Sequence, residues 1–152
     1  MTTSTRMTDK DRWVTSRIGP TGFHTNIRAA SHHMIADEPI DVGGSERGPT
    51  PYEFLLAALG SCTVMTLRIY ADRKGWPLEG AVVHLRSTRS HEKDCEDCTT
   101  TKVDIGRIER RLEFEGPLSD EQRSRLEEIA DRCPVKQTLE RGIVVQAAES
   151  DQ

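Results

Sequence analysis

The sequence has few aromatic residues, no cluster of basic residues and no long apolar run at its N-terminus. Aromatic residues make up 5% of the chain, charged residues make up 30%, and the net charge is -4. Without a basic surface, the protein is not expected to bind nucleic acid or an anionic membrane. The polar start MTTSTRMTD lacks the apolar region of a signal peptide, and the longest uncharged stretch, Phe54–Leu67, is shorter than the roughly 20 residues of a membrane helix. These absences predict a cytoplasmic protein.

The length and the cysteine content limit the remaining possibilities. A chain of 152 residues can bury one core without disulfides. We expect a flexible N-terminus over residues 1–10 and a single domain over residues 11–152. Four cysteines in a cytoplasmic protein are rarely structural disulfides, so catalysis, redox sensing and metal binding have to be considered.

The residue patterns predict an α+β domain with antiparallel sheet. Alternating or β-rich segments predict strands, and glycine and proline mark the turns between them. The predicted strands are Arg12–Ile18, Phe23–Ala29, His32–Ala36, Gly80–His91, Lys102–Glu115 and Ile143–Ala147. Gly80–His91 and Lys102–Glu115 are expected to form a hairpin, and the glycine-rich residues Asp37–Pro49 are expected to form a loop.

Two capping boxes predict where helices begin. Thr50-Pro51-Tyr52-Glu53 has the pattern of an N-cap, a first-turn proline and a reciprocal glutamate, and it opens a helix to about Lys74. This helix is apolar on all sides between Phe54 and Leu67, so we expect it to be buried on most sides. Ser119–Gln122 opens a second helix, which is expected to end near Arg132.

Cys62 and Cys133 are the candidate reactive thiols. Cys62 lies in the middle of the first apolar helix, where an inert buried thiol is the simpler interpretation. Cys133 precedes Pro134 at a predicted helix start, where free N–H groups and the helix dipole lower the pKa of a thiol. The alternative for Cys133 is a weak N-cap in place of serine. The spacing alone does not show whether the two thiols meet.

Two cysteine motifs resemble those of one known family. The run GPTPYEFLLAALGSCTVMTLRIYADRKGWPL resembles the central cysteine helix of the OsmC/Ohr family, and ADRCPVKQTL resembles its second cysteine motif. The resemblance implies an intertwined homodimer, with antiparallel sheets packed around a buried central helix. It also implies a peroxidase that reduces organic hydroperoxides. Hydrogen peroxide is a further candidate substrate. Cys62 would form a sulfenic acid, Cys133 would resolve it, and a dithiol would reduce the resulting disulfide without any cofactor.

The chain departs from the family pattern at two supporting residues. The family carries a glutamate directly after the proline that opens the cysteine helix, whereas here that position is Tyr52 and the acid is Glu53. Glu53 lies nine residues before Cys62, which places it on the opposite face of a helix, so helix capping is its expected role. The family's active-site arginine comes from the N-terminal strands. This chain offers Arg28, Arg17 and Arg12 there without a motif that distinguishes them, and we select Arg28.

His91, Cys95 and Cys98 form a second candidate cluster, in the connection HEKDCEDCTT. Their spacing is that of zinc ligands, but only one ligand pair and one histidine are present. The nearby acidic residues would raise the pKa of both thiols, which disfavours a redox pair. A polar loop with two unreactive thiols is the third interpretation.

Three other functions compete with the peroxidase hypothesis. The chain could be a non-catalytic OsmC-like sensor or binding module, or a metalloprotein with its site in the Cys95–Cys98 loop. A Cys–His hydrolase would use His24, His32 or His33, but nothing in the sequence orients these histidines toward Cys62.

Overall fold

The computed structural model describes residues 13–88 and 106–148, which form two compact units. Residues 13–54 belong to the first unit, and residues 55–88 and 106–148 belong to the second. The α+β class is confirmed. Residues 1–10, which we expect to be flexible, lie outside the described residues. The single domain over residues 11–152 also stays a prediction.

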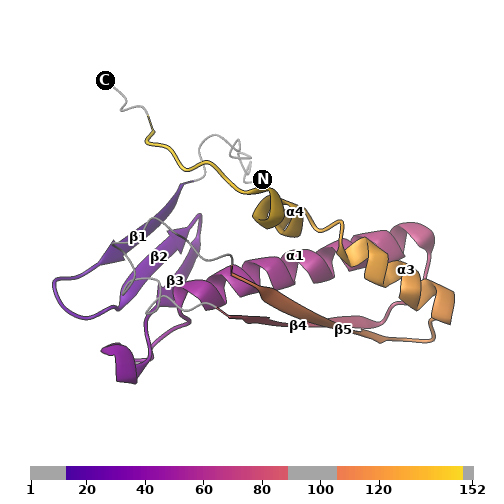
Figure 1. Ribbon diagram of the computed structural model, residues 1–152, viewed down its shortest axis with the longest axis horizontal. Helices are drawn as coiled ribbons and strands as arrows, with labels where there is room; N and C mark the ends of the chain where they lie inside the picture. Colours follow the sequence, from indigo (N-terminus) through magenta and orange to yellow (C-terminus); the bar gives the residue numbers. More distant parts are fainter. Residues whose placement is uncertain (1–12, 89–105, 149–152) are drawn as a thin grey trace, which may run out of the picture. The chain divides into compact units, whose positions relative to one another are not determined.

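The first unit contains a three-stranded antiparallel sheet in the order β1-β2-β3. The strands are β1 (Val14–Ile18), β2 (Thr25–Ala29) and β3 (His32–Ala36), and Ile27 in β2 pairs with Ser16 and Met34 on either side. All three predicted strands are therefore present, although β2 begins two residues later than predicted. The sheet is drawn in indigo in Figure 1.

A buried carboxylate organises the loop that follows β3. Asp37 is 2% exposed and accepts backbone hydrogen bonds from Glu38 at 2.8 Å and from Ser45 and Arg47 at 3.3 Å. Burial raises the pKa of Asp37, but these N–H groups outweigh burial and the net pKa is lowered. Gly44 has to be glycine here, because a Cβ atom would lie 1.8 Å from the Glu38 carbonyl oxygen. The predicted loop also contains a short 3-10 helix, η2 (Ile40–Val42).

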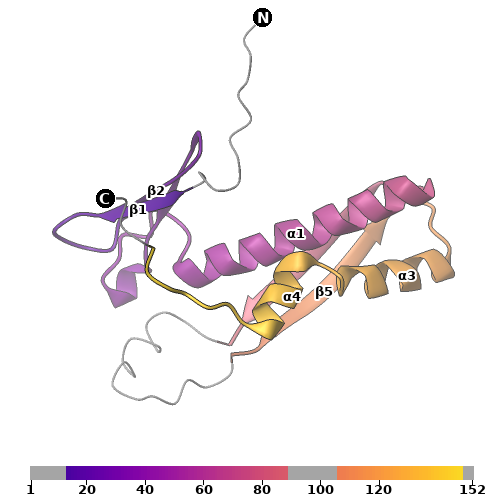
Figure 2. The same cartoon turned by 90° about the horizontal axis from the view of Figure 1, so that it is seen from above.

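The second unit packs the long helix α1 against a two-stranded ribbon and two shorter helices. Figures 1 and 2 show α1 lying along the ribbon with α3 beside its C-terminal half. The elements are α1 (Pro51–Lys74), β4 (Gly80–Ser87), β5 (Ile108–Glu115), α3 (Asp120–Ala130) and α4 (Pro134–Arg141). β4 and β5 are antiparallel, so the predicted hairpin strands do pair.

The core of this unit joins α1 to α3. Leu67 and Ala71 of α1 and Leu126 of α3 are fully buried, and Leu78, Leu118, Ile129 and Ala130 complete the cluster. Gly60 of α1 faces β4, because a Cβ atom there would be in van der Waals contact with Leu85 Cδ1 at 3.4 Å. The first half of α1 therefore packs on the ribbon and its second half packs on α3.

The membrane prediction needs one correction. We expected no segment long enough to span a membrane, but α1 is long and apolar enough to do so by length and composition. The uncharged stretch ends at Leu67, but Ile69, Tyr70 and Ala71 extend the apolar helix beyond it. The buried side of α1 packs on its own unit, as expected for the core helix of a soluble protein.

Both capping boxes are present at the predicted residues. Thr50 N–H donates to Glu53 Oε2 at 2.7 Å and Glu53 N–H donates to Thr50 Oγ1 at 3.3 Å. Ser119 and Gln122 make the same reciprocal pair at 3.0 and 3.1 Å. α3 ends at Ala130, before the predicted Arg132, and a short turn leads to Cys133 as the N-cap of α4.

Two strand predictions are wrong in part or in full. Residues 143–147 form no strand, and the side chains of Ile143, Val144 and Val145 are exposed. No strand pairs with this segment in the described part of the chain, so its β-branched composition is not sufficient to form one. β5 begins at Ile108 rather than Lys102; residues 102–105 lie outside the described residues, and Gly106 and Arg107 are not in the strand.

Candidate active site

The fold brings Cys62 and Cys133 together within the second unit. Cys62 lies in the middle of α1 and Cys133 is the N-cap of α4, with Pro134 at the first helical position. Their side chains interact directly, and both are free thiols. Cys133 is completely buried, whereas Cys62 is partly exposed. A small molecule from solvent can therefore reach Cys62 more easily than Cys133.

The start of α4 stabilises a thiolate on Cys133. Burial raises the pKa of Cys133, but the backbone N–H groups of Lys136 and Val135, the Cys62 thiol and the Thr63 hydroxyl favour its charged form. The net pKa is lowered. Cys133 makes no side-chain capping hydrogen bond of the kind that serine makes at an N-cap. The expectation that this helix start lowers the pKa of a thiol agrees with the structure.

The pKa of Cys62 shifts in the opposite direction. Burial raises its pKa, and the neighbouring Cys133 sulfur raises it further, while the Val135 N–H and the Thr66 hydroxyl act in the opposite direction. The net pKa is raised. The Cys133 thiol therefore loses its proton more readily than the Cys62 thiol.

Two threonines of α1 support this pair. Thr63 is fully buried, and its hydroxyl donates to the Leu59 carbonyl at 2.8 Å as well as contacting Cys133. Thr66 donates to the Cys62 carbonyl at 2.8 Å. These bonds to the preceding helical turn fix both hydroxyls next to the sulfur atoms.

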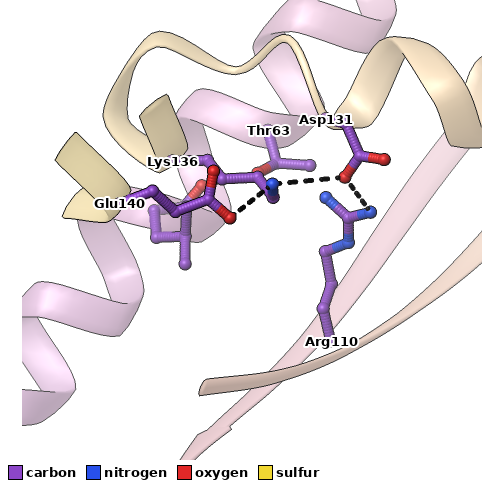
Figure 3. A network of polar contacts seen from close by, with 6 residues as sticks. Thr63, Arg110, Asp131, Lys136 and Glu140 are labelled. Carbon is purple, nitrogen blue, oxygen red and sulfur yellow. Dashed lines mark hydrogen bonds and ion pairs between the residues drawn. The ribbon is translucent and has the colours of Figure 1, made fainter. Parts of the chain in front are cut away.

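Figure 3 shows an ion-pair network that we did not predict, drawn together with Thr63 of α1. Arg110 Nη2 of β5 is 2.9 Å from Asp131 Oδ1, and Lys136 Nζ of α4 is 3.6 Å from the same oxygen and 2.7 Å from Glu140 Oε1. The sequence does place Arg110 on the apolar face of its strand, where a paired arginine is expected. It does not identify Asp131, which is 21 residues away, as the partner.

A pocket of about 450 Å³ lies next to this network. Its apolar wall comes from Leu59, Leu85, Ile108 and Leu139, and its polar wall includes Arg110, Lys136 and Glu140. Leu59 is one helical turn before Thr63, and Lys136 lies in the first turn after Cys133. The pocket is thus built from the same helix segments that hold the two cysteines.

The two supporting residues that we predicted belong to the first unit. Glu53 bonds the Thr50 backbone as part of the helix cap, as described above. Arg28 is exposed on β2, where it faces Thr15 and His33 of the neighbouring strands. Their assistance to Cys62 stays a prediction.

The other candidate residues are not part of the cysteine pair. His91, Cys95 and Cys98 lie outside the described residues, and so does the zinc site that they would form. His32 and His33 are exposed on β3, and His24 precedes β2 in the first unit, where it interacts with Asp37. Within residues 13–88 and 106–148 no group of three metal-binding side chains occurs.

Comparisons with known proteins identify the family and support the fold. The family model described as OsmC-like protein matches residues 43–148. The OsmC-like protein of Mycoplasma pneumoniae is 20% identical, with 88% of this chain and 89% of that chain covered and a TM-score of 0.69. An organic hydroperoxide resistance protein OsmC of Legionella pneumophila is 12% identical, with 88% and 91% covered and a TM-score of 0.64. No curated protein matches the sequence.

A third structure has a related description. An organic hydroperoxide resistance protein of Elizabethkingia anophelis is 15% identical, with 89% of each chain covered and a TM-score of 0.61. At these identities the similarity shows the fold. The fold and the paired thiols define an α+β protein with a two-cysteine centre. The family match covers both cysteines and more than half of the sequence, so the chain belongs to the OsmC-like family.

Proposed function

We propose that this protein is a thiol peroxidase that reduces organic hydroperoxides with electrons from a dithiol. The observation that carries the proposal is the direct interaction of a partly exposed thiol, Cys62, with a buried thiol at a helix start, Cys133. A peroxide can reach the first sulfur, and the second is already in place to form a disulfide with it. The OsmC-like fold supports the proposal, because two structural relatives are described as organic hydroperoxide resistance proteins.

The first step is the reduction of the peroxide by Cys62. The step starts from a pair in which Cys133 has lost its proton to solvent. The Cys62 proton moves to the Cys133 sulfur, which accepts its hydrogen bond, and this leaves a thiolate on the accessible cysteine. That thiolate attacks one peroxide oxygen and the O–O bond breaks. The alkoxide leaves as an alcohol after taking the proton back from Cys133, and Cys62 becomes a sulfenic acid. Cys133 is then a thiolate again.

The second and third steps close the cycle. The Cys133 thiolate attacks the Cys62 sulfur and releases hydroxide, which solvent protonates to water. A dithiol then reduces the Cys62–Cys133 disulfide by thiol–disulfide exchange and becomes a disulfide itself. The sum is one hydroperoxide and one dithiol converted to one alcohol, one water and one disulfide. No metal or organic cofactor takes part, and the reducing cytoplasm is the compartment that suits such a dithiol.

We also propose that the protein works as an intertwined homodimer. One side of α1 is exposed although it carries apolar or small residues: Ala57, Ala58, Ser61, Met65 and Ile69. Met65 and Ile69 border an apolar hollow of about 410 Å³ that Leu78 and Ala81 also line. Exposed apolar surface of this kind favours contact with a second copy of the chain.

The test of the activity is consumption of hydroperoxide in the presence of a dithiol. An alkyl hydroperoxide and hydrogen peroxide should be compared side by side with the native protein and with Cys62→Ser and Cys133→Ser. We expect steady consumption of the alkyl hydroperoxide by the native protein and none by Cys62→Ser, because serine is nearly isosteric but is no peroxide nucleophile. Consumption by Cys62→Ser at the native rate would refute the proposal. Oxidation that stops after one equivalent despite excess dithiol would favour the non-catalytic sensor.

A further inference from the structure

Asp131 connects β5 to the helix start that holds Cys133. Its Oδ1 atom binds two cations, Arg110 Nη2 at 2.9 Å and Lys136 Nζ at 3.6 Å, and Lys136 Nζ is also 2.7 Å from Glu140 Oε1 (Figure 3). These four residues come from β5, from the end of α3 and from α4. The network therefore fixes the turn between α3 and α4 against the sheet.

Cys133 lies inside this turn. Asp131 precedes it by two residues, and Lys136 follows it by three. The Lys136 side chain takes part in the ion-pair network, while the backbone N–H of the same residue favours the charged form of the Cys133 sulfur. A movement of the first turn of α4 would therefore change the N–H groups that face this sulfur.

Arg110 is the member of the network that comes from the rigid sheet. It lies on the packed face of β5, between Ile108 and Leu112, and its side chain is 22% exposed. Its Nη1 atom is buried and has no hydrogen-bond partner in the described part of the chain. An arginine held here by a single carboxylate is costly to bury, so a stabilising role in the core does not by itself explain it.

We propose that Arg110 is a positioning residue for the cysteine pair: through Asp131 and Lys136 it holds the first turn of α4, and so fixes the backbone N–H groups that face the Cys133 sulfur. This inference rests on the proposed peroxidase function and deepens it, because those N–H groups determine how readily Cys133 provides the thiolate that resolves Cys62. It does not require Arg110 to touch the peroxide.

The charged and titratable groups around the pair come from four elements. α1 contributes Cys62 itself with the Thr63 and Thr66 hydroxyls, β5 contributes Arg110, the end of α3 contributes Asp131, and α4 contributes Lys136 and Glu140. Replacement of Arg110 by a neutral residue leaves Asp131 with Lys136 alone and frees the turn from the sheet. Both effects disfavour a thiolate at Cys133.

The test compares Arg110→Met with Arg111→Met by measuring thiolate absorbance in the ultraviolet as a function of pH. Arg111 is the next residue on the same strand, but it faces the opposite side and is exposed, so it is a matched control. Cys95 and Cys98 are present in every variant and cancel in the comparison. We expect Arg110→Met to move the first thiol titration upward by about one pH unit, the effect of weakening one hydrogen bond to a charged group, and Arg111→Met to leave it unchanged. An equal midpoint in both variants would contradict the proposal.

A second pair of variants separates positioning from general stability. Arg110→Lys retains the charge and can contact Asp131, so its thiol titration midpoint should stay close to that of the native protein. An upward shift as large as that of Arg110→Met would contradict the ion-pair mechanism. If Arg110→Met does not fold, Arg110→Gln takes its place: a smaller upward shift is expected, and an unchanged midpoint refutes the inference. The titration uses no peroxide, so its outcome is independent of whether the protein proves to be a peroxidase.

Discussion

Glu53 is the residue at which a catalytic role and a structural role predict different outcomes. In the structure, its carboxylate accepts the Thr50 N–H at 2.7 Å, and its own N–H donates to Thr50 Oγ1 at 3.3 Å. Glu53→Ala removes the first bond and retains the second, so it should lower the free energy of unfolding by about 0.5–2 kcal/mol. For a chain of this size that corresponds to a decrease of about 1–8 °C in melting temperature. Glu53→Gln should cost much less, because the glutamine amide oxygen can accept the same bond.

The assay combines thermal unfolding with hydroperoxide consumption for each variant. Thr50→Ala is the matched control, since it removes the other half of the same box and should lower the melting temperature without a specific loss of rate. We expect Glu53→Gln to retain nearly the native melting temperature and nearly the native rate. A large rate loss in Glu53→Gln with an unchanged melting temperature would refute the capping role and place Glu53 in the active site.

Three further predictions concern assembly, acid stability and the resolving thiol. Met65→Lys, which places a charge on the exposed apolar side of α1, should lower the mass measured by light scattering from dimer to monomer, whereas Glu127→Lys on the exposed side of α3 should not. Because the pKa of Asp37 is lowered from 3.8, its carboxylate stabilises the fold above that pH and the stabilisation is lost as the pH falls. Asp37→Asn should therefore be less stable than the native chain at pH 7, and the difference should shrink below about pH 4 in denaturant titrations; an equal difference at both pH values would contradict this. Cys133→Ser should leave Cys62 as a sulfenic acid that a dimedone-type reagent captures, and failure to capture it would argue against attack by Cys62.

Signals confined to a few neighbouring residues predicted the structure well. Both capping boxes are formed by residues three apart, and the helices begin where the boxes place them. Alternation of apolar and polar residues likewise identified β5, although the strand begins at Ile108 rather than at the predicted Lys102. Such patterns are readable because the interacting groups are close along the chain.

Features that depend on distant partners could not be read in the same way. Residues 143–147 have the composition of a strand, but a strand also needs an edge to pair with, and no described segment of this chain offers one. The apolar residues around α1 suggested burial on most sides, yet Met65 and Ile69 are exposed in the single chain. The composition of a segment indicates that its side chains tend to be buried, but it does not identify the segment that packs or pairs with it.

The candidate site likewise has features that the sequence predicts and features that depend on distant residues. The sequence singled out Cys62 and Cys133, and the motif context suggested that they act together. Their direct interaction and the link from Arg110 to Asp131 depend on the packing of α1, β5 and α4. These contacts join residues 21 or more positions apart, for which the spacing contains no signal.

The most direct test of the two-cysteine mechanism is peptide mapping after the reduced native protein has reacted with one equivalent of an alkyl hydroperoxide. The structure places the two sulfurs in contact, so we predict a disulfide between Cys62 and Cys133, formed within each chain and reversed by a dithiol. Alkylation of remaining thiols before digestion prevents exchange, and the untreated protein is the control. A Cys133 that remains alkylatable after oxidation, with Cys62 overoxidised or joined to Cys95 or Cys98, would contradict the proposed mechanism.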